Sequence, residues 1–205
     1  MEFNQQLFET MDKHLLEDDK PSEYFVNLNN AEFYSEYPFT MLSNLQNTEQ
    51  SPIYHPEGNV WNHTMLVIDA AALTKEKSSD GRVFMWAALL HDIGKPDTTR
   101  TRKGKITSYD HDKLGSEMSK KFLAQFEEDK VFIEKVAALV RWHMQILFVV
   151  KSLPFADVKN MKEQAPIYDV ALLGLCDRLG RLGADKKKEE ENIRIFLEKC
   201  KAQNI

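Results

Sequence analysis

The chain is poor in cysteine, glycine and proline, and each shortage excludes a class of protein. Only Cys176 and Cys200 occur among the 205 residues. Two cysteines are too few for a disulfide-stabilised scaffold and predict a reducing compartment. The 8 glycines and 7 prolines are scattered without a period, so the sequence is neither a repeat protein nor a low-complexity chain.

Long hydrophobic runs are also missing. The longest, Val83–Leu90 and Val170–Cys176, fall far short of the roughly 18 to 20 residues that span a bilayer. The first 20 residues are acidic and contain no apolar block of the kind found in signal peptides. We therefore expect a cytoplasmic protein with no membrane partner.

The charge balance excludes a further class. The chain has 27 Lys and Arg against 32 Asp and Glu, a net charge of −5, which argues against extended binding of nucleic acid. Apolar residues make up 42% and charged residues 29%, as in compact globular proteins. The composition predicts one domain over residues 1–205 and leaves the oligomeric state open.

The hydrophobic pattern is mainly helical. Apolar residues recur at the 3.6-residue helical period, with short breaks at glycines and prolines, and this predicts an all-α bundle. Residues 98–109 are the exception, because they alternate around Lys103-Gly104 and predict a small β-hairpin. We divide the chain into a helical N-terminal extension (1–50), a core (52–184) and a C-terminal helix (185–205).

Six polar residues interrupt the apolar faces of these helices. His63 shares a face with Val60 and Val67, and the core face of the next helix leads to His91 and Asp92 at its C-terminal end. The same pattern occurs on three later helices. The six residues are His63, His91, Asp92, His111, His143 and Asp177.

One buried histidine is usually a hydrogen-bonded core residue, but six such residues call for a shared explanation. Four imidazoles and two carboxylates buried together would lack partners without a cation, and divalent metals prefer these donors. Asp92 is the natural bridge between two cations. A metal makes water a nucleophile near neutral pH, which predicts hydrolysis without a nucleophilic side chain.

The extended motifs resemble a known family. YHPEGNVWNHT (54–64), LLHDIGKP (89–96) and CDRLGR (176–181) are similar to the HD-domain metal-dependent phosphohydrolases, most closely to the HD domain of bacterial CCA-adding tRNA nucleotidyltransferases. Two departures stand out. No Gly-Gly-Ser stretch or paired-Asp motif of a transferase domain precedes His55, and Asp110 stands where those relatives would have glycine.

The resemblance implies a helical HD-domain bundle and a phosphohydrolase that acts on phosphomonoesters, cyclic phosphodiesters or nucleotides. By position, His63, His91, Asp92 and Asp177 match the metal ligands of the family. His111 and His143 match the histidines that accompany a second metal in some members. The implied cofactor is one or two divalent ions, with Mn, Ni, Co, Fe, Mg and Zn all open.

Charged residues near these motifs are candidates for contact with a phosphate. Lys95 follows the His-Asp pair by three residues, and Arg181 shares a helix face with Asp177. Arg178, which directly follows Asp177, is a weaker candidate. Arg102 belongs to a basic loop, formed with Arg100, Lys103 and Lys105, that joins the His91-Asp92 helix to His111 and is a candidate lid for an anionic substrate. We assign catalytic roles to Asp92 and Lys95, and a supporting role beside the ligands, or as acid and base, to His55 and Glu57.

Two other functions remain open at this stage. Some relatives with a six-residue set are di-iron oxygenases, and a nucleotide-sensing module would keep the metal for structure alone. The basic loop and Lys95 favour a phosphate-bearing substrate. We therefore expect a small phosphoester or nucleotide as the substrate, with an RNA end as a further possibility.

Overall fold

The computed structural model describes residues 2–28, 36–127 and 129–202, and these residues are largely helical, as the sequence predicts. The helices are α1 (Glu2–Glu17), α2 (Ser22–Leu28), α3 (Thr40–Ser43), α4 (Val60–Ala72), α5 (Gly81–Leu90), α6 (Lys95–Thr98), α7 (His111–Leu123), α8 (Lys130–Trp142), α9 (Gln145–Val150), α10 (Val158–Gln164), α11 (Ile167–Leu179) and α12 (Lys186–Ala202), with short 3₁₀ turns η2 (Asn44–Asn47) and η3 (Lys75–Lys77).

The predicted hairpin is present. Strands β1 (Thr99–Arg102) and β2 (Lys105–Ser108) pair in antiparallel register, and no other strand occurs in the described part of the chain. Lys103 and Gly104 join them with φ values of 50° and 72°. A positive φ at both central residues gives the turn a twist that matches the right-handed twist of the paired strands.

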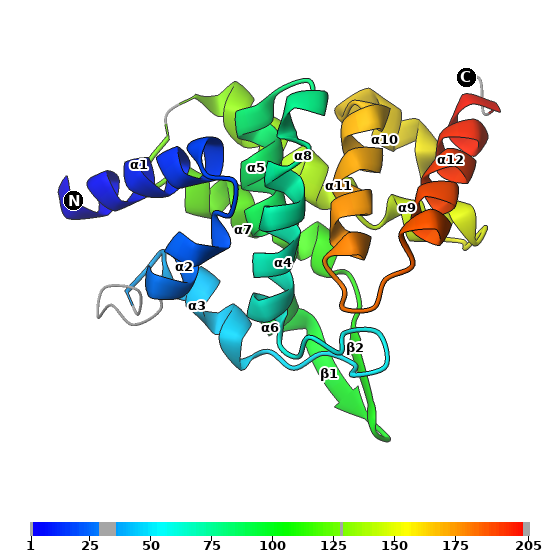
Figure 1. The fold of residues 1–205 in the computed structure, drawn as a ribbon, viewed down its shortest axis with the longest axis horizontal. Helices are drawn as coiled ribbons and strands as arrows, with labels where there is room; N and C mark the ends of the chain where they lie inside the picture. The colour runs from blue at the N-terminus through cyan, green and yellow to red at the C-terminus, as the bar shows by residue number, and fades with distance from the viewer. Residues whose placement is uncertain (1, 29–35, 128, 203–205) are drawn as a thin grey trace.

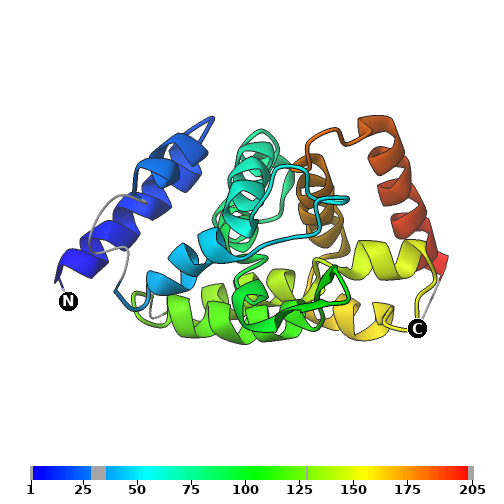
Figure 2. The same ribbon diagram turned by 90° about the horizontal axis from the view of Figure 1, so that it is seen from below.

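The helices are arranged along one long axis, with α1 and α12 at opposite ends (Figure 1). Seen from below, α7 to α10 form one row, and α1, α2, α4, α11 and α12 form a second row above it (Figure 2). The hairpin projects from the body at the lower edge of Figure 1. No described helix combines the length and the apolar character needed to cross a bilayer.

One hydrophobic core joins the N-terminal helices to the rest of the chain. Trp86 of α5 is fully buried; its ring stacks on Phe8 of α1 with centroids 4.7 Å apart, and its Nε1 donates to Asp12 Oδ1 at 2.6 Å. The expected extension therefore contributes apolar residues to the same core. Residues 1 and 29–35 of that extension lie outside the described residues, and the division into extension, core and C-terminal helix stays a prediction.

Helix ends bring the candidate ligands to one place. Helix α4 starts after Asn59, whose side chain accepts the N–H of Asn62, and places His63 in its first turn. Helices α5 and α8 end just before His91 and His143. The carbonyls of a last helical turn have no partner within the helix and carry partial negative charge, so these ends favour N–H donors and cations.

Candidate metal centre

The six predicted ligands are all buried, and the structure brings them together from α4, α7 and α11 and the ends of α5 and α8. Their exposed fractions are 0% for His63, 0% for His91, 2% for Asp92, 6% for His111, 2% for His143 and 7% for Asp177. Charged and imidazole groups at this depth need partners. The atoms that lie next to each of these groups therefore determine whether the cluster can bind a metal ion.

Three of the histidines are oriented by backbone carbonyls three residues earlier. Nδ1 of His91, His111 and His143 lies 2.8, 2.6 and 2.7 Å from the carbonyl oxygens of Ala88, Ser108 and Val140, respectively. A carbonyl only accepts, so Nδ1 carries the proton and donates it. In the neutral ring the lone pair is then on Nε2.

Those Nε2 atoms converge on Asp92. Oδ2 of Asp92 is 3.2 Å from His91 Nε2, and Oδ1 is 3.4 Å from His111 Nε2 and 3.8 Å from His143 Nε2. Nε2 of His111 and Nε2 of His143 are 3.2 Å apart. The two oxygens of Asp92 therefore face different histidines, the geometry of a bridging carboxylate.

His63 closes the other side of the cluster. Its Nε2 lies 3.0 Å from Asp177 Oδ1, and its Nδ1 lies 2.9 Å from Glu57 Oε1. Burial opposes a positive charge here, but hydrogen bonds to Asp177 and Glu57 raise the pKa of His63. A proton on Nε2 occupies the lone pair that a metal ion would use, so protons and metal compete at this ring.

The donors fit divalent metal ions. Buried lone pairs on His111 and His143 face each other, and Nε2 of His91 has no hydrogen-bond partner among the described residues. A cation satisfies these atoms, whereas a second neutral acceptor does not. Two groups have ligand atoms within 4.8 Å of one another and share Asp92. They are His63, His91 and Asp92, and Asp92, His111 and His143.

The protonation states suit ligation. Burial opposes ionisation of both aspartates, yet Lys95 and His91 hold the pKa of Asp92 well below its usual range, and Arg181 and His63 do the same for Asp177. Burial lowers the pKa of His111. Carboxylates that stay ionised beside an imidazole that stays neutral, as at Asp92 and His111, are ready to bind a cation.

The metal-free protein should lose stability between pH 6.5 and 4. Burial, followed by the charges of His111 and His91, lowers the pKa of His143 to about 4, below the 6.5 of an unfolded chain. The unfolded chain therefore takes up a proton first as the pH falls, which favours unfolding. In chemical denaturation with chelator, His143→Gln should reduce the pH slope by up to about 1.4 kcal/mol per pH unit. An unchanged slope would contradict this assignment.

Lys95 lies inside the centre. Its side chain is largely buried, and Nζ is 2.6 Å from Asp92 Oδ2 and donates to Gln50 Oε1 at 2.6 Å. An ammonium has three donors, so one remains for a ligand. Gln50 was not predicted, because it follows a polar stretch with no periodic pattern and no motif.

The three arginines predicted to contact a phosphate, Arg181, Arg178 and Arg102, have different surroundings. Arg181 Nη2 lies 3.3 Å from Asp177 Oδ1, and its buried Nε has no hydrogen-bond partner within the described residues. Arg178 instead turns to Glu189 at 3.1 Å, near the start of α12. Arg102 is exposed on β1. The structure thus brings Arg181 to the centre and leaves Arg178 and Arg102 out of the ligand cluster.

Glu57 connects His55 to the cluster. Glu57 Oε1 lies 2.9 Å from Nδ1 of both His55 and His63, and its Oε2 accepts the N–H of Leu182 at 3.3 Å. Although burial opposes it, the hydrogen bonds from His63 and His55 lower the pKa of Glu57 to about 2. Burial and the charge of Lys95 lower the pKa of His55 to about 4. Glu57 is placed to fix both imidazole rings.

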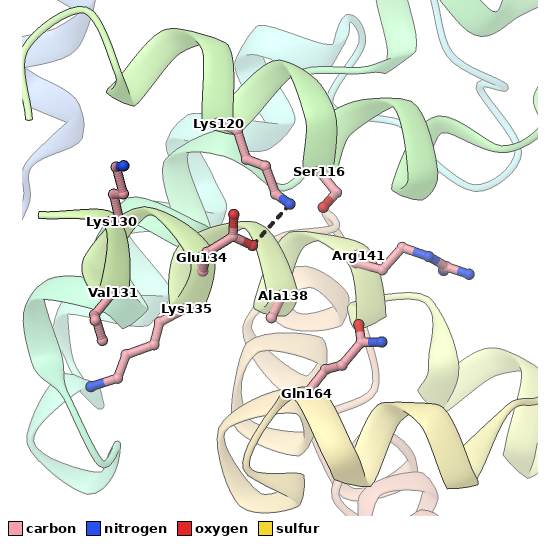
Figure 3. A pocket seen from close by; sticks show the side chains of 9 residues that line it. All are labelled: Ser116, Lys120, Lys130, Val131, Glu134, Lys135, Ala138, Arg141 and Gln164. Atoms are coloured by element: carbon pink, nitrogen blue, oxygen red, sulfur yellow. Dashed lines mark ion pairs between the residues drawn. The ribbon is translucent and has the colours of Figure 1, made fainter. Parts of the chain in front are cut away.

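A separate cavity of about 480 Å³ lies along α7, α8 and α10 (Figure 3). None of its lining residues is one of the predicted ligands. Two of its basic side chains pair with carboxylates, Lys120 with Glu134 at 2.8 Å and Arg141 with Asp112. The cavity therefore adds no functional group to the centre.

The comparison with protein families fits this geometry. The sequence-family model of the HD domain matches residues 60–179, which is more than half of the chain. The chain belongs to the HD domain family. Every one of the six ligand candidates lies within the matched region, and the buried His/Asp groups are consistent with the divalent-metal binding that is typical of HD domains.

Relatives of the HD domain chain include tRNA nucleotidyltransferases. This chain is 25% identical over 191 residues to the multifunctional CCA protein of Hahella chejuensis, and the match covers 88% of this chain and 43% of that protein. It is 29% identical over 152 residues to the CC-adding tRNA nucleotidyltransferase of Thermus thermophilus, covering 73% of this chain and 33% of that protein. The chain thus spans less than half the length of these relatives.

Proposed function

We propose that this HD domain is a divalent-metal phosphohydrolase that acts on small phosphoesters such as nucleotides, in the cytoplasm. The observation that supports it best is the set of imidazole lone pairs aimed at the two oxygens of Asp92, with His91 Nε2 left without a hydrogen bond. Such a donor set holds metal in preference to serving as a hydrogen-bonded core.

The residues divide into two roles. His63, His91, Asp92 and Asp177 would hold one ion, and His111 and His143 would hold a second ion with Asp92. A bound divalent ion supplies a Lewis acid and lowers the pKa of water to near neutral. The backbone carbonyls keep the rings in one tautomer, and Glu57 keeps His63 oriented.

Two cations of the chain suit a substrate phosphate. Lys95 Nζ contacts Asp92 and Gln50 and keeps one donor for a phosphoryl oxygen. Arg181 contacts Asp177 through Nη2, and its Nε is unpartnered among the described residues. Both cations are held next to ligand carboxylates, so an anion bound there lies beside the metal centre. Positive charge placed in advance stabilises the charge that develops on a phosphoryl group.

The test combines metal analysis with a substrate panel. Purified protein should contain one or two equivalents of divalent metal, and it should release phosphate or open a ring on some member of a panel of nucleoside monophosphates, cyclic nucleotides and dinucleotides. The panel is run with added manganese, nickel, cobalt and magnesium, and with zinc and iron. Chelator should stop turnover.

The other two functions predict different results. Iron in the purified protein with oxygen consumption would replace this proposal with a di-iron oxygenase. Tight nucleotide binding without product would replace it with a sensing module. The unpaired donor of Lys95 and the cations around the centre favour a phosphohydrolase over an oxygenase, because the activation of oxygen does not itself use a phosphate contact.

A further inference from the structure

The β1–β2 hairpin carries four exposed cations. They are Arg100, Arg102, Lys103 and Lys105. None of them pairs with a carboxylate in the part of the chain that the structure describes. Asp110, just beyond β2, is held by Lys113 at 2.7 Å, and Asp97 precedes β1. A chain of net charge −5 thus has a local concentration of unpaired positive charge.

The strand register places three of these cations on one face. Arg102 lies directly opposite Lys105, and Arg100 lies opposite Thr107. Residues two apart on a strand share a face, so Arg100, Arg102 and Lys105 point the same way. The opposite face carries uncharged residues only, namely Thr99, Thr101, Ile106 and Ser108.

This arrangement costs the hairpin stability. Like charges directly opposite each other destabilise a strand pair. Lys103 also adopts φ 50° in a turn position that usually holds asparagine or glycine. Neither feature helps the hairpin to fold, and a polyanion lying along the cationic face would remove the repulsion.

The hairpin is attached directly to the metal centre. Ser108, the last residue of β2, accepts the ring N–H of His111 at 2.6 Å, and its hydroxyl bonds Thr99 at the base of β1 at 2.7 Å. Strand β1 follows α6, which begins at Lys95. The hairpin that carries the cationic face therefore begins beside the centre and leads away from the body (Figure 1).

Exposed aromatic rings accompany the cations. Tyr109 follows β2 and is 74% exposed, and Tyr54, beside His55, is 66% exposed. The segment before α4, which contains Tyr54, lies at the same lower end of the molecule as the hairpin (Figure 1). Cations for a phosphate backbone beside aromatic rings for bases are the combination that binds single-stranded nucleic acid.

We propose that the cationic face of the hairpin and Tyr109 bind a short single-stranded nucleic acid whose end lies in the metal centre. This inference rests on the proposed function, since it takes the centre as the place of the reacting phosphate. A mononucleotide has no further phosphates to reach the hairpin. The hairpin would therefore favour strands over mononucleotides, with a footprint of a few nucleotides only.

The test measures strand binding without turnover. Fluorescence anisotropy of a labelled ten-nucleotide single strand is followed with metal-loaded protein over a range of salt concentrations. The triple variant R100Q/R102Q/K105Q should bind at least about 10-fold more weakly, and its slope of log affinity against log salt should fall by about 2. The matched control K186Q/K187Q/K188Q removes the same charge from the start of α12, where all three lysines are exposed, and should bind like the wild type.

A second arm separates nucleic acid from other polyanions. Tyr109→Ala should weaken strand binding about 5-fold or more, while Tyr168→Ala, which removes a similarly exposed ring from α11, should not. Inorganic polyphosphate of matched charge should be insensitive to Tyr109→Ala. Equal losses in the two triple variants, no loss in the hairpin variant, or equal effects of Tyr109→Ala on both polyanions would overturn the proposal.

The two proposals fail separately. Binding by anisotropy needs no hydrolysis, so a protein that binds strands through the hairpin but releases no product supports the hairpin and refutes the phosphohydrolase. Conversely, hydrolysis of mononucleotides with no hairpin-dependent strand binding refutes only the inference drawn from the hairpin. Circular dichroism and thermal melting of each variant show that the fold is intact.

Discussion

Asp92→Asn is expected to remove bound metal and hydrolysis together. Asp92 is shared by both ligand groups, and each of its oxygens faces a different histidine. A neutral amide loses the charge that balances the cations. We expect metal affinity to fall by more than roughly 100-fold, beyond the loss of an outer partner, and kcat/KM to fall by about 10³-fold or more.

The measurements are metal content after dialysis and turnover of the best panel substrate. Asparagine is preferred to alanine because Lys95 Nζ lies 2.6 Å from Asp92 Oδ2, and truncation would leave this buried ammonium with the Gln50 oxygen but no acceptor at position 92. Asp169→Asn is the matched control, since Asp169 is also buried but binds Ser79. Full metal content in Asp92→Asn would refute the assignment of the centre.

Gly94→Ala is expected to destabilise the fold and to weaken the second ligand group. A Cβ on Gly94 would lie 2.4 Å from the carbonyl oxygen of His111 and 2.7 Å from the backbone nitrogen of Gly115. Backbone atoms cannot turn aside as a side chain does, so α6 and α7 must separate. Overpacking of this kind costs about 3 kcal/mol, and it moves His111 away from Asp92.

Chemical denaturation and metal titration test both effects. Gly81→Ala is the control, because the nearest atom to its added Cβ is 3.8 Å away and alanine is favoured over glycine in a helix. The control should be as stable as the wild type or slightly more stable. If Gly94→Ala unfolds like Gly81→Ala, the close packing of α6 on α7 is not what holds His111 in place.

The ligand candidates could be found from the sequence because burial follows helical period. A polar residue that continues the apolar face of a helix is buried with that face, whichever element packs against it. The burial of His63 and His143 could therefore be predicted without knowing which helices lie next to them. The helical fold and the hairpin follow from the same local patterns. These are properties that a few consecutive residues determine.

Other features depend on contacts that no local pattern encodes. Arg178 lies in α11, whereas Arg181 follows the end of that helix and does not share the helix face that the sequence predicts. Only the packing of α12 directs Arg178 to Glu189. Gln50 reaches Lys95 across 45 positions of sequence. Asp110 adopts φ 59°, a left-handed conformation in which glycine is unstrained and aspartate is tolerated.

The pairing of His63 with Asp177 joins residues that are 114 positions apart. A cation held between α4 and α11 would close that stretch into one large loop, as a cross-link does, at a point where the chain has no disulfide. A link between distant segments lowers the conformational entropy of the unfolded chain. An ion that binds only the folded form also adds its binding free energy to the stability of that form. Loading with metal would then set the lifetime of this protein against proteases as well as its chemistry.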